Sequence, residues 1–364
     1  MCDVIYLLGS LNRGGAETLI LDVFNNASNA NFEFAGIYRK GGVLEQAFKS
    51  TNVTFKKLSP RFPFDPRYLS GLRSLVLSEG AEIVHAQQYI DAIYAKIALM
   101  GTKVKIVQTY HGYDLGQSRR GDFLIKTISK RIDCNVFVSE TQRDFFVRKL
   151  QLPLERTAVV YNGLNFTKLG DVKKRVPHDG KVIIGTVGNF VIGRDPMTLC
   201  RFLEKLAEEN IDFEFFFVGR RDEKTPDFYD NCVRFCESQG LNDKVHFLGG
   251  RSDVPELLAK WDAFMYSTDH DTFGIAVVEA IASGMPVFVN DWDVMKEISM
   301  DGKFAVLYKT KNVDDLYDKF RSFLQNQTEY YQTATNNAEE IRCIYSIESH
   351  LQSLHKLYDK ILSK

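Results

Sequence analysis

The stretch that decides the fold is residues 4–25, VIYLLGSLNRGGAETLILDVFN. Its first five residues form an apolar run typical of a buried parallel strand. A glycine-bearing loop follows over residues 9–15. Residues 16–25 then place four apolar side chains on one face of a helix: Leu19, Ile20, Val23 and Phe24. A strand, a loop and a helix in this order predict the start of a doubly wound α/β sheet.

The same alternation continues up to residue 161. Strands are expected at residues 34–38, 82–86, 105–110, 134–138 and 157–161. Helices are expected at residues 69–78, 90–99, 123–131 and 141–149. Residues 164–180 are polar and show no periodicity, which predicts a linker between two domains.

The pattern restarts after this linker. Strands are expected at residues 182–188, 213–219, 245–248, 263–267 and 287–290. Helices are expected at residues 196–210, 227–239, 254–260, 275–283, 313–324 and 330–361, the last broken near Ser346. The sequence therefore predicts an α/β protein of two tandem Rossmann-like domains facing a cleft, over residues 1–165 and 181–346.

Composition excludes several function classes. The net charge of −1 argues against a dominant nucleic-acid role. Residues 1–165 hold 21 Lys+Arg and 15 Asp+Glu, a balance of +6, so the remainder carries −7. This asymmetry suggests different partners for the two halves, or chance variation in solvated surface.

The six cysteines lack zinc-ligand spacing, and we expect buried free thiols. Without a visible signal peptide or membrane span, a cytoplasmic protein is expected, one that could touch the inner face of a membrane.

The segment with the strongest chemical signal is residues 269–286, DHDTFGIAVVEAIASGMP. It places an acidic loop and Gly274 directly before a helix, whose N-terminal N–H groups and dipole suit a phosphate. Glu279, inside that helix, could accept hydrogen bonds from ribose hydroxyls. Asp271, before the helix, could accept them from sugar hydroxyls.

This segment resembles the E-x7-E motif of retaining GT-B glycosyltransferases of family 4, with Asp271 and Glu279 at the two acidic positions. The resemblance covers nearly the whole chain. It includes a glycine loop at residues 12–17, a histidine strand end at 110–112, a first-domain end at 160–163 and a loop at 255–258. It also implies that a C-terminal helix, about residues 347–364, crosses back to the first domain.

The resemblance implies the site residues. Catalytic roles fall on His111, Arg194 and Asp271. Donor binding falls on Gly14, Gly15, Asn189, Arg194, Arg251, Phe273, Gly274, Ile275 and Glu279. Acceptor binding falls on Glu17, His85 and Asn162. Structural readings stand beside these roles: Gly14 and Gly15 could form a tight turn, and His111 and His85 could be satisfied core histidines.

The sequence departs from the family pattern at three positions. Asp271 stands where the family usually has glutamate, and its carboxylate reaches about one methylene less far. Asn189 replaces the usual arginine of the diphosphate clamp, and Arg194 replaces the usual lysine. One cation of the clamp thus remains, and an arginine can meet a diphosphate with two hydrogen bonds. Three further arginines could compensate: Arg220, Arg221 and Arg251.

The function that follows is transfer of a hexose from a nucleoside-diphosphate sugar, UDP-sugar favoured over GDP-sugar, to a glycan or lipid-linked acceptor in surface polysaccharide synthesis. The resemblance implies retained anomeric configuration and no metal or other cofactor. Residues 269–271 superficially match the D-x-D of metal-dependent transferases, but their place before a second-domain helix fits the metal-free class better. Residues 117–131 are basic and amphipathic, which suggests contact with anionic lipid or a lipid diphosphate; a packed helix with solvated ends is the alternative.

Two other functions remain open from the sequence. A sugar-nucleotide epimerase of the same fold would need ionisable groups poised at a sugar carbon, and none stand out beyond the histidines. A non-catalytic binder of sugar nucleotides is compatible with Asp271 and Asn189. A dehydrogenase fits less well, because the first turn lacks a G-x-G-x-x-G run.

Overall fold

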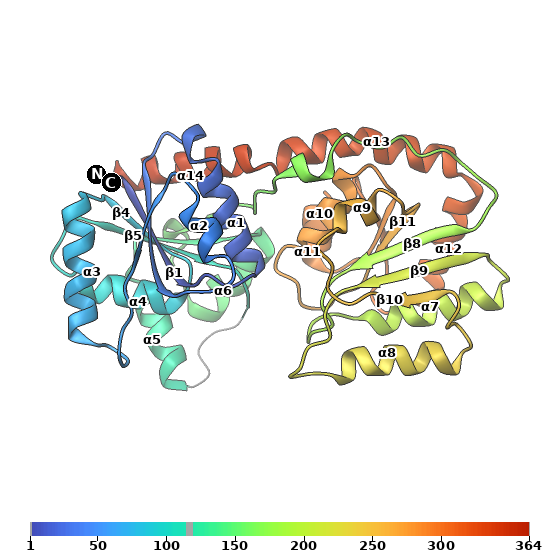
Figure 1. The fold of residues 1–364 in the computed structure, drawn as a ribbon, viewed down its shortest axis with the longest axis horizontal. Helices are drawn as coiled ribbons and strands as arrows, with labels where there is room; N and C mark the ends of the chain where they lie inside the picture. The colour runs from blue at the N-terminus through green and yellow to red at the C-terminus, as the bar shows by residue number, and fades with distance from the viewer. Residues whose placement is uncertain (1, 114–118, 364) are drawn as a thin grey trace. The chain divides into compact units, whose positions relative to one another are not determined.

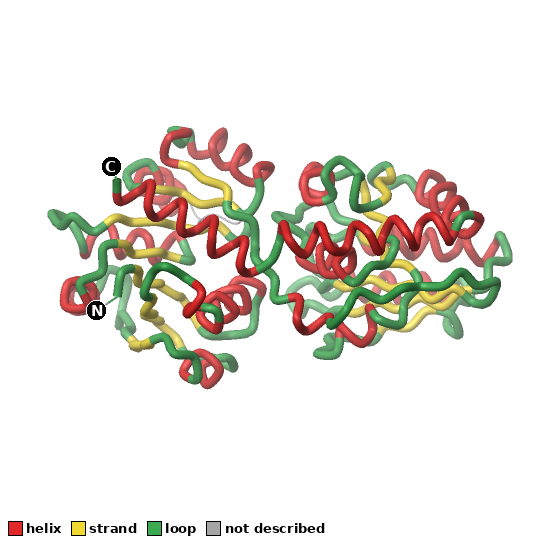
Figure 2. Tube along the Cα trace, turned by 90° about the horizontal axis from the view of Figure 1, so that it is seen from above, coloured by secondary structure: helices red, strands yellow, loops and turns green. Residues whose placement is uncertain are grey.

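A computed structural model describes residues 2–113 and 119–363 of the chain. The chain divides into two compact units: unit 1 comprises Met1–Asn165 and Tyr345–Lys364, and unit 2 comprises Phe166–Ile344. Each unit contains one parallel sheet with helices on both faces (Figures 1 and 2). This confirms the predicted α/β class of two Rossmann-like domains.

Unit 1 is built on a seven-stranded sheet in the order β3-β2-β1-β4-β5-β6-β7. Its strands are β1 (Val4–Ser10), β2 (Phe34–Lys40), β3 (Thr54–Lys57), β4 (Ile83–Ala86), β5 (Lys105–Tyr110), β6 (Cys134–Phe137) and β7 (Thr157–Val159). Its α-helices are α1 (Gly15–Asn25), α2 (Glu45–Lys49), α3 (Pro66–Glu79), α4 (Tyr89–Ala98), α5 (Arg119–Ser129), α6 (Glu140–Leu150) and α14 (Ile347–Leu362).

Unit 2 is built on a six-stranded sheet in the order β10-β9-β8-β11-β12-β13. Its strands are β8 (Val182–Val187), β9 (Phe213–Val218), β10 (Val245–Phe247), β11 (Ala263–Tyr266), β12 (Val287–Asn290) and β13 (Val306–Tyr308). Its α-helices are α7 (Pro196–Glu208), α8 (Asp227–Ser238), α9 (Val254–Leu258), α10 (Ile275–Ala282), α11 (Asp293–Ile298), α12 (Val313–Gln325) and α13 (Gln327–Ile344).

Each sheet has one point where the strand order reverses. In unit 1, β1 pairs with β2 on one side and β4 on the other. In unit 2, β8 pairs with β9 on one side and β11 on the other. The loops that leave the carboxyl ends of the two central strands diverge at such a point, and α/β proteins bind ligands there. The sheet order therefore marks one candidate ligand-binding position in each unit.

The first strand is apolar throughout because both of its faces are buried. Val4, Tyr6 and Leu8 pack in a core with α1 and α14, whereas Ile5 and Leu7 pack in a second core with α3 and α4. Helix α14 buries one apolar face in the first core, through Leu351, Leu354, Leu357, Tyr358 and Ile361. The C-terminal helix is thus part of the wall of unit 1.

Four elements were missing from the sequence prediction: α2, β3, α11 and β13. Each is short, three to six residues long by its bounds, so no periodicity could develop within it. The predicted break near Ser346 is confirmed. Helix α13 ends at Ile344, and the Ser346 side chain caps α14 by accepting a hydrogen bond from the amide of Ser349 at 3.1 Å.

The polar segment expected to be a linker makes specific contacts with unit 2. The guanidinium of Arg175, within this segment, donates to the carbonyls of Trp261 and Leu258, both at 2.8 Å. It also donates to the carbonyl of Ser283 at 3.3 Å. Burial lowers the pKa of Arg175 to about 10. The loop is irregular in sequence, but a buried arginine holds it against α9 and the end of α10.

The cysteines are all free thiols, and five of the six are buried as expected. Cys343 is the exception, because it lies on the exposed side of α13. Cys232 and Cys236 share one buried face of α8, and Cys200 of α7 lies in the same core.

Candidate donor and acceptor sites

The reversal point of unit 2 brings together two loops that the sequence keeps far apart. One loop follows β8 and carries Arg194; the other follows β11 and carries Asp271. The two loops pair through an antiparallel bridge between Arg194 and Thr268. The amide of Asp269 and the hydroxyl of Thr268 both donate to the carbonyl of Gly193, at 3.0 and 2.7 Å. The predicted catalytic residues Arg194 and Asp271 are therefore neighbours.

Arg194 is held by the last side chain of β11 and by one side chain of the loop that follows β11. Its Nη1 lies 3.4 Å from Oδ2 of Asp271, and its Cζ lies 4.3 Å from the centre of the Tyr266 ring. The hydroxyl of Tyr266, a buried residue, donates a hydrogen bond to the same Oδ2. Burial lowers the pKa of Arg194 and Asp271 opposes that shift, but an arginine stays protonated in proteins. The result is a guanidinium fixed beside a carboxylate at the carboxyl edge of the sheet.

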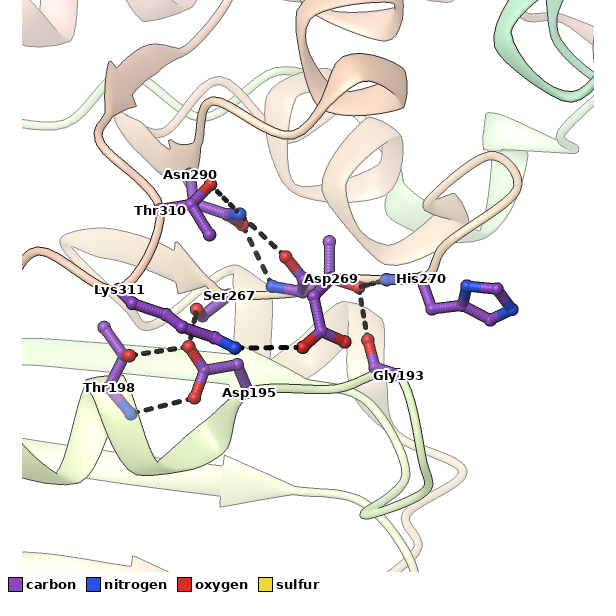
Figure 3. A network of polar contacts seen from close by, with 10 residues as sticks. Gly193, Asp195, Thr198, Ser267, Asp269, His270, Asn290, Thr310 and Lys311 are labelled. Carbon is purple, nitrogen blue, oxygen red and sulfur yellow. Dashed lines mark hydrogen bonds and ion pairs between the residues drawn. The ribbon is translucent and has the colours of Figure 1, made fainter. Parts of the chain in front are cut away.

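A network of polar contacts joins these two loops to β11, β12 and α7 (Figure 3). Asp195 caps α7, because its carboxylate accepts from the amide and hydroxyl of Thr198 at 3.3 and 2.6 Å, and it also accepts from the hydroxyl of Ser267 at 3.2 Å. The side chain of Asn290 accepts from the amide of Thr268 at 2.9 Å and donates to its carbonyl at 2.7 Å. Because these contacts fix Gly193 and Asp195, the residues on either side of Arg194, the guanidinium of Arg194 is preorganised.

Helix α10 begins beside these loops, and its start requires a glycine. Gly274 has φ +89°, and a Cβ there would lie 2.8 Å from Cε of Met295 in α11. No side chain caps this helix, and the amide of Val277 donates to the carbonyl of Gly274 at 3.0 Å, so the donors that a ligand could meet at its start are the amides of Ile275 and Ala276. Glu279 lies in the second turn and is half-buried, Ile275 is half-buried, and Phe273 is buried in the unit.

The substitute for the missing clamp arginine has a structural partner. The side-chain oxygen of Asn189 accepts from the amide of Arg220 at 2.9 Å, which ties the loop after β8 to the loop after β9. The two loops approach so closely that a Cβ on Gly219 would lie 1.9 Å from the carbonyl oxygen of Gly188. Asn189 thus has a clear role in loop geometry, and its predicted contact with donor stays a prediction.

Two of the three arginines considered as compensating cations already have ionic partners. Arg221 makes two hydrogen bonds of 2.7 Å to Asp230, and Arg251 makes bonds of 2.8 and 2.5 Å to Asp253. Within residues 2–113 and 119–363, the guanidinium of Arg220 has neither an ion pair nor a hydrogen bond. Arg220 is therefore a better candidate than Arg251 for the second cation at a diphosphate.

The reversal point of unit 1 carries the predicted glycine loop. Helix α1 begins at Gly15 after Gly14, and no side chain caps it. The carboxylate of Glu17 lies beside this start, since a Cβ on Gly14 would be 2.5 Å from Oε2 of Glu17. Burial raises the pKa of Glu17. An anionic group approaching the start of α1 would meet a carboxylate already there, so this helix end is less suited to a diphosphate than α10.

His85 is held inside unit 1 by two hydrogen bonds. Its Nδ1 lies 2.6 Å from the hydroxyl of Tyr358, and its Nε2 lies 2.7 Å from Oγ1 of Thr109. The ring is 2 % exposed, and burial lowers its pKa to about 3. With both nitrogens bonded to protein, this placement favours the structural role of His85 over the predicted contact with acceptor.

His85, His111 and His350 form a histidine cluster in unit 1, and His111 and His350 are more exposed to solvent than His85. Nε2 of His111 lies 2.8 Å from Oε1 of Gln87, and Nδ1 of His350 donates to the carbonyl of Tyr161 at 2.6 Å. Burial lowers the pKa of each ring to about 4, and for His111 the nearby His350 adds to the shift. Both rings are therefore neutral at pH 7, which suits His111 to bonding a sugar hydroxyl rather than an anion.

Sequence reasoning missed Gln87, His350 and Tyr358 in this cluster. A signal existed for the two α14 residues, because His350, Leu354, Tyr358 and Ile361 recur at helical spacing on one face. Polar groups on an apolar helix face point to a buried polar network. Gln87 had no such signal, since it follows β4 in a loop.

Two features are absent from the residues that the structure describes. In residues 2–113 and 119–363, none of the helices combines the length and the apolar character needed to cross a bilayer. The same residues contain no group of three or more His, Cys, Asp or Glu side chains placed to hold a metal ion. The basic segment 117–131 lies partly outside the described residues.

Comparison with known proteins identifies the family. The model of "Glycosyl transferases group 1" matches residues 170–341, and that of "Glycosyltransferase Family 4" matches residues 13–168. An uncharacterized glycosyltransferase of Methanocaldococcus jannaschii is 26 % identical over 297 residues, covering 79 % of this chain and 78 % of the relative. An N-acetylgalactosaminyltransferase of Campylobacter jejuni is 28 % identical over 240 residues, covering 62 % of this chain and 60 % of the relative. Its name gives diacetylbacillosaminyl-diphospho-undecaprenol as the acceptor.

Solved structures show the same architecture. Anabaena HepE in complex with UDP superposes with a TM-score of 0.84 at 16 % identity, covering 98 % of this chain and 100 % of that one. WaaG, a glycosyltransferase involved in lipopolysaccharide biosynthesis, superposes with a TM-score of 0.69 at 14 % identity over 97 % and 99 % of the two chains. The chain therefore belongs to the group 1 glycosyltransferases, transferase enzymes of the GT-B fold.

Proposed function

We propose that the protein is a retaining, metal-independent hexosyltransferase that uses a UDP-sugar and a glycan or lipid-linked acceptor in surface polysaccharide synthesis. The observation that carries the proposal is the cation at the reversal point of unit 2. Arg194 lies 3.4 Å from Asp271 and against the ring of Tyr266. A diphosphate bound at the start of α10 would lie next to the loop that carries Arg194.

The chemistry needs a fixed positive charge at this place. Breaking the bond between the anomeric carbon and the diphosphate oxygen leaves negative charge on the leaving group. Donors that are already oriented stabilise this charge without reorganising during the reaction. Arg194 supplies two parallel N–H groups, and the uncapped first turn of α10 supplies backbone N–H groups. Glu279 would accept hydrogen bonds from the ribose.

Relatives support the classes of donor and acceptor. Anabaena HepE has been solved with UDP and with UDP-glucose. A relative in Escherichia coli, 22 % identical over 76 % of both chains, is named as a galactosyltransferase that uses UDP-Gal and a diphosphoundecaprenol-linked GlcNAc. The Campylobacter relative is likewise named for a diphospho-undecaprenol acceptor. A lipid-linked acceptor would bring the enzyme to the inner face of a membrane, where the basic first half of the chain, with exposed Phe123 on α5, offers a peripheral contact.

The direct test is turnover of a donor in the absence of acceptor. Purified protein should bind UDP and hydrolyse a UDP-hexose slowly. An excess of EDTA should leave the hydrolysis rate unchanged, because no metal contributes to charge stabilisation in the proposed mechanism. Proton NMR of the hydrolysis should show the α-hexose before mutarotation. Release of the β-hexose would contradict retention, loss of activity in EDTA would contradict metal independence, and absence of nucleotide binding would contradict the whole proposal.

Glu279 provides the test of the donor site. Replacing Glu279 with Ala should weaken UDP binding by about 10- to 100-fold, since a hydrogen bond to a charged group contributes about 1.5–3 kcal/mol. Isothermal titration calorimetry would measure the change. Glu237→Ala is the matched control, because Glu237 is an exposed glutamate on another helix of unit 2, α8, outside the family motifs. Equal UDP affinity in the two variants would remove Glu279 from the site.

A further inference from the structure

A small cavity lies inside unit 1, at the carboxyl edge of its sheet and between that edge and helices α1 and α14. Its volume is about 10 Å³, close to the space that one water molecule needs. Apolar side chains of α1 and β6 form much of the wall. The polar wall consists of His85, Gln87, Thr109, His111, Asn162 and His350.

Two wall residues carry polar atoms that the protein leaves unpaired. Gln87 is 7 % exposed and Asn162 is 8 % exposed. Among the described residues, neither Nε2 of Gln87 nor Oδ1 of Asn162 has a hydrogen-bond partner. One atom is a donor and the other an acceptor. A buried polar atom without a partner costs about 1–3 kcal/mol, so two such atoms on one cavity point to a shared third group.

The other end of the Gln87 amide contacts His111. Oε1 of Gln87 lies 2.8 Å from Nε2 of His111, and an amide oxygen can only accept a hydrogen bond. In this orientation the single ring proton of neutral His111 lies on Nε2. In this orientation the Gln87 amide therefore stabilises the tautomer of His111 that carries its proton on Nε2.

We propose that the cavity binds one water molecule between Gln87 and Asn162, and that Gln87, oriented by this water, is a positioning residue that keeps the proton of His111 on Nε2. The water accepts from Nε2 of Gln87 and donates to Oδ1 of Asn162. Reversing the amide would present its oxygen to the cavity and its N–H groups to His111, which would move the ring proton to Nδ1. A neutral, small ligand fits this site, since the three histidines around it are held uncharged by burial.

Long-range ¹H–¹⁵N NMR of the histidine rings tests this proposal, because the two tautomers give different cross-peak patterns. The NMR experiment uses the full chain without donor or acceptor, so its outcome does not depend on the proposed transfer reaction. Only the kinetics of donor hydrolysis rest on the proposed function. Wild type should show a single Nε2–H form of His111, assigned by its loss in His111→Asn. Gln87→Met and Asn162→Leu should each convert it to a mixture. His85 is the internal control, since Tyr358 and Thr109 hold its nitrogens, and its pattern should not change.

Gln87→Glu keeps an accepting oxygen and adds a charge. It should keep the Nε2–H form and raise the pKa of His111 by about one to three units, as a nearby carboxylate does. In donor hydrolysis, Gln87→Met should lower kcat about tenfold with little change in KM, and Gln87→Glu should recover most of it, because positioning affects the reacting group rather than donor binding. An Nδ1–H form in wild type, or an unchanged His111 pattern in Asn162→Leu, would overturn the proposal.

Discussion

Replacing Arg194 with Gln should lower kcat for donor turnover by about 100- to 1000-fold, with a smaller change in KM. Removing one preorganised donor from a site of developing negative charge has an effect of this size. Because negative charge on the diphosphate grows as the bond breaks, the cation contributes more in the transition state than in the bound ground state. Steady-state kinetics with a UDP-hexose would measure both constants.

Three further variants make this result specific. Arg194→Lys keeps the charge but loses the two-pronged geometry, so it should retain about a tenth or more of the activity. Arg234→Gln and Arg321→Gln remove exposed arginines of the same unit, on α8 and α12, and each should change kcat less than about twofold. Thermal denaturation would show that Arg194→Gln is folded. Activity in that variant within a few-fold of wild type would show that the diphosphate is stabilised elsewhere, with Arg220 as the first residue to examine.

Acidification should destabilise unit 1 before unit 2. Burial lowers the pKa values of His85, His111 and His350 from 6.5 to about 3, 4 and 4. Between pH 6.5 and pH 4 the unfolded chain therefore binds protons that the folded chain does not. The stability from these neutral rings is fully present above pH 6.5 and is lost as the pH falls toward 4. Each ring contributes up to about 3 kcal/mol over this range, and the free energy of unfolding of a whole domain is only about 5–15 kcal/mol.

The chain allows the two units to be followed separately. Both tryptophans, Trp261 and Trp292, lie in unit 2. Urea unfolding from pH 7.5 to 4.5 should show the loss of stability in hydrogen exchange of unit 1 peptides, while tryptophan fluorescence reports unit 2. His85→Gln should weaken the pH dependence, and His246→Gln in unit 2 should not alter it for unit 1. Parallel loss of stability in both units would mean that other titrating groups dominate.

The regular part of the fold could be predicted because its elements are long enough to show a period. Helices such as α7 and strands such as β5 were located to within a few residues. The break between α13 and α14 was also visible, since Ser346 interrupts the apolar pattern and suits a helix cap. The short elements were not predictable. Helix α11 was missed, although Met295 and Ile298 from it define the space at Gly274.

The candidate site was predicted in composition but not in its contacts. The motif at residues 269–286 and Arg194 were both selected from the sequence, yet nothing in their separation shows that Asp271 contacts Arg194 through the same oxygen that receives the Tyr266 hydroxyl. Nor could the sequence show that Asn189 holds the amide of Arg220, or that Arg251 is paired with Asp253. Side-chain partners depend on loop paths, which carry no periodic signal.

The opening stretch, residues 4–25, and the return of its pattern after residue 182 determined the fold class, because burial of parallel strands on both faces imposes a continuous apolar run. The motif at residues 269–286 pointed to the family. The tertiary structure alone decided which loops meet. Strand order places β8 beside β11 and β1 beside β4, and only this order brings Arg194 to Asp271 and surrounds one small cavity with Gln87, Asn162 and a histidine from the C-terminal helix. Local sequence fixes periodicity, whereas the pairing of strands distant in the chain depends on packing across the whole sheet.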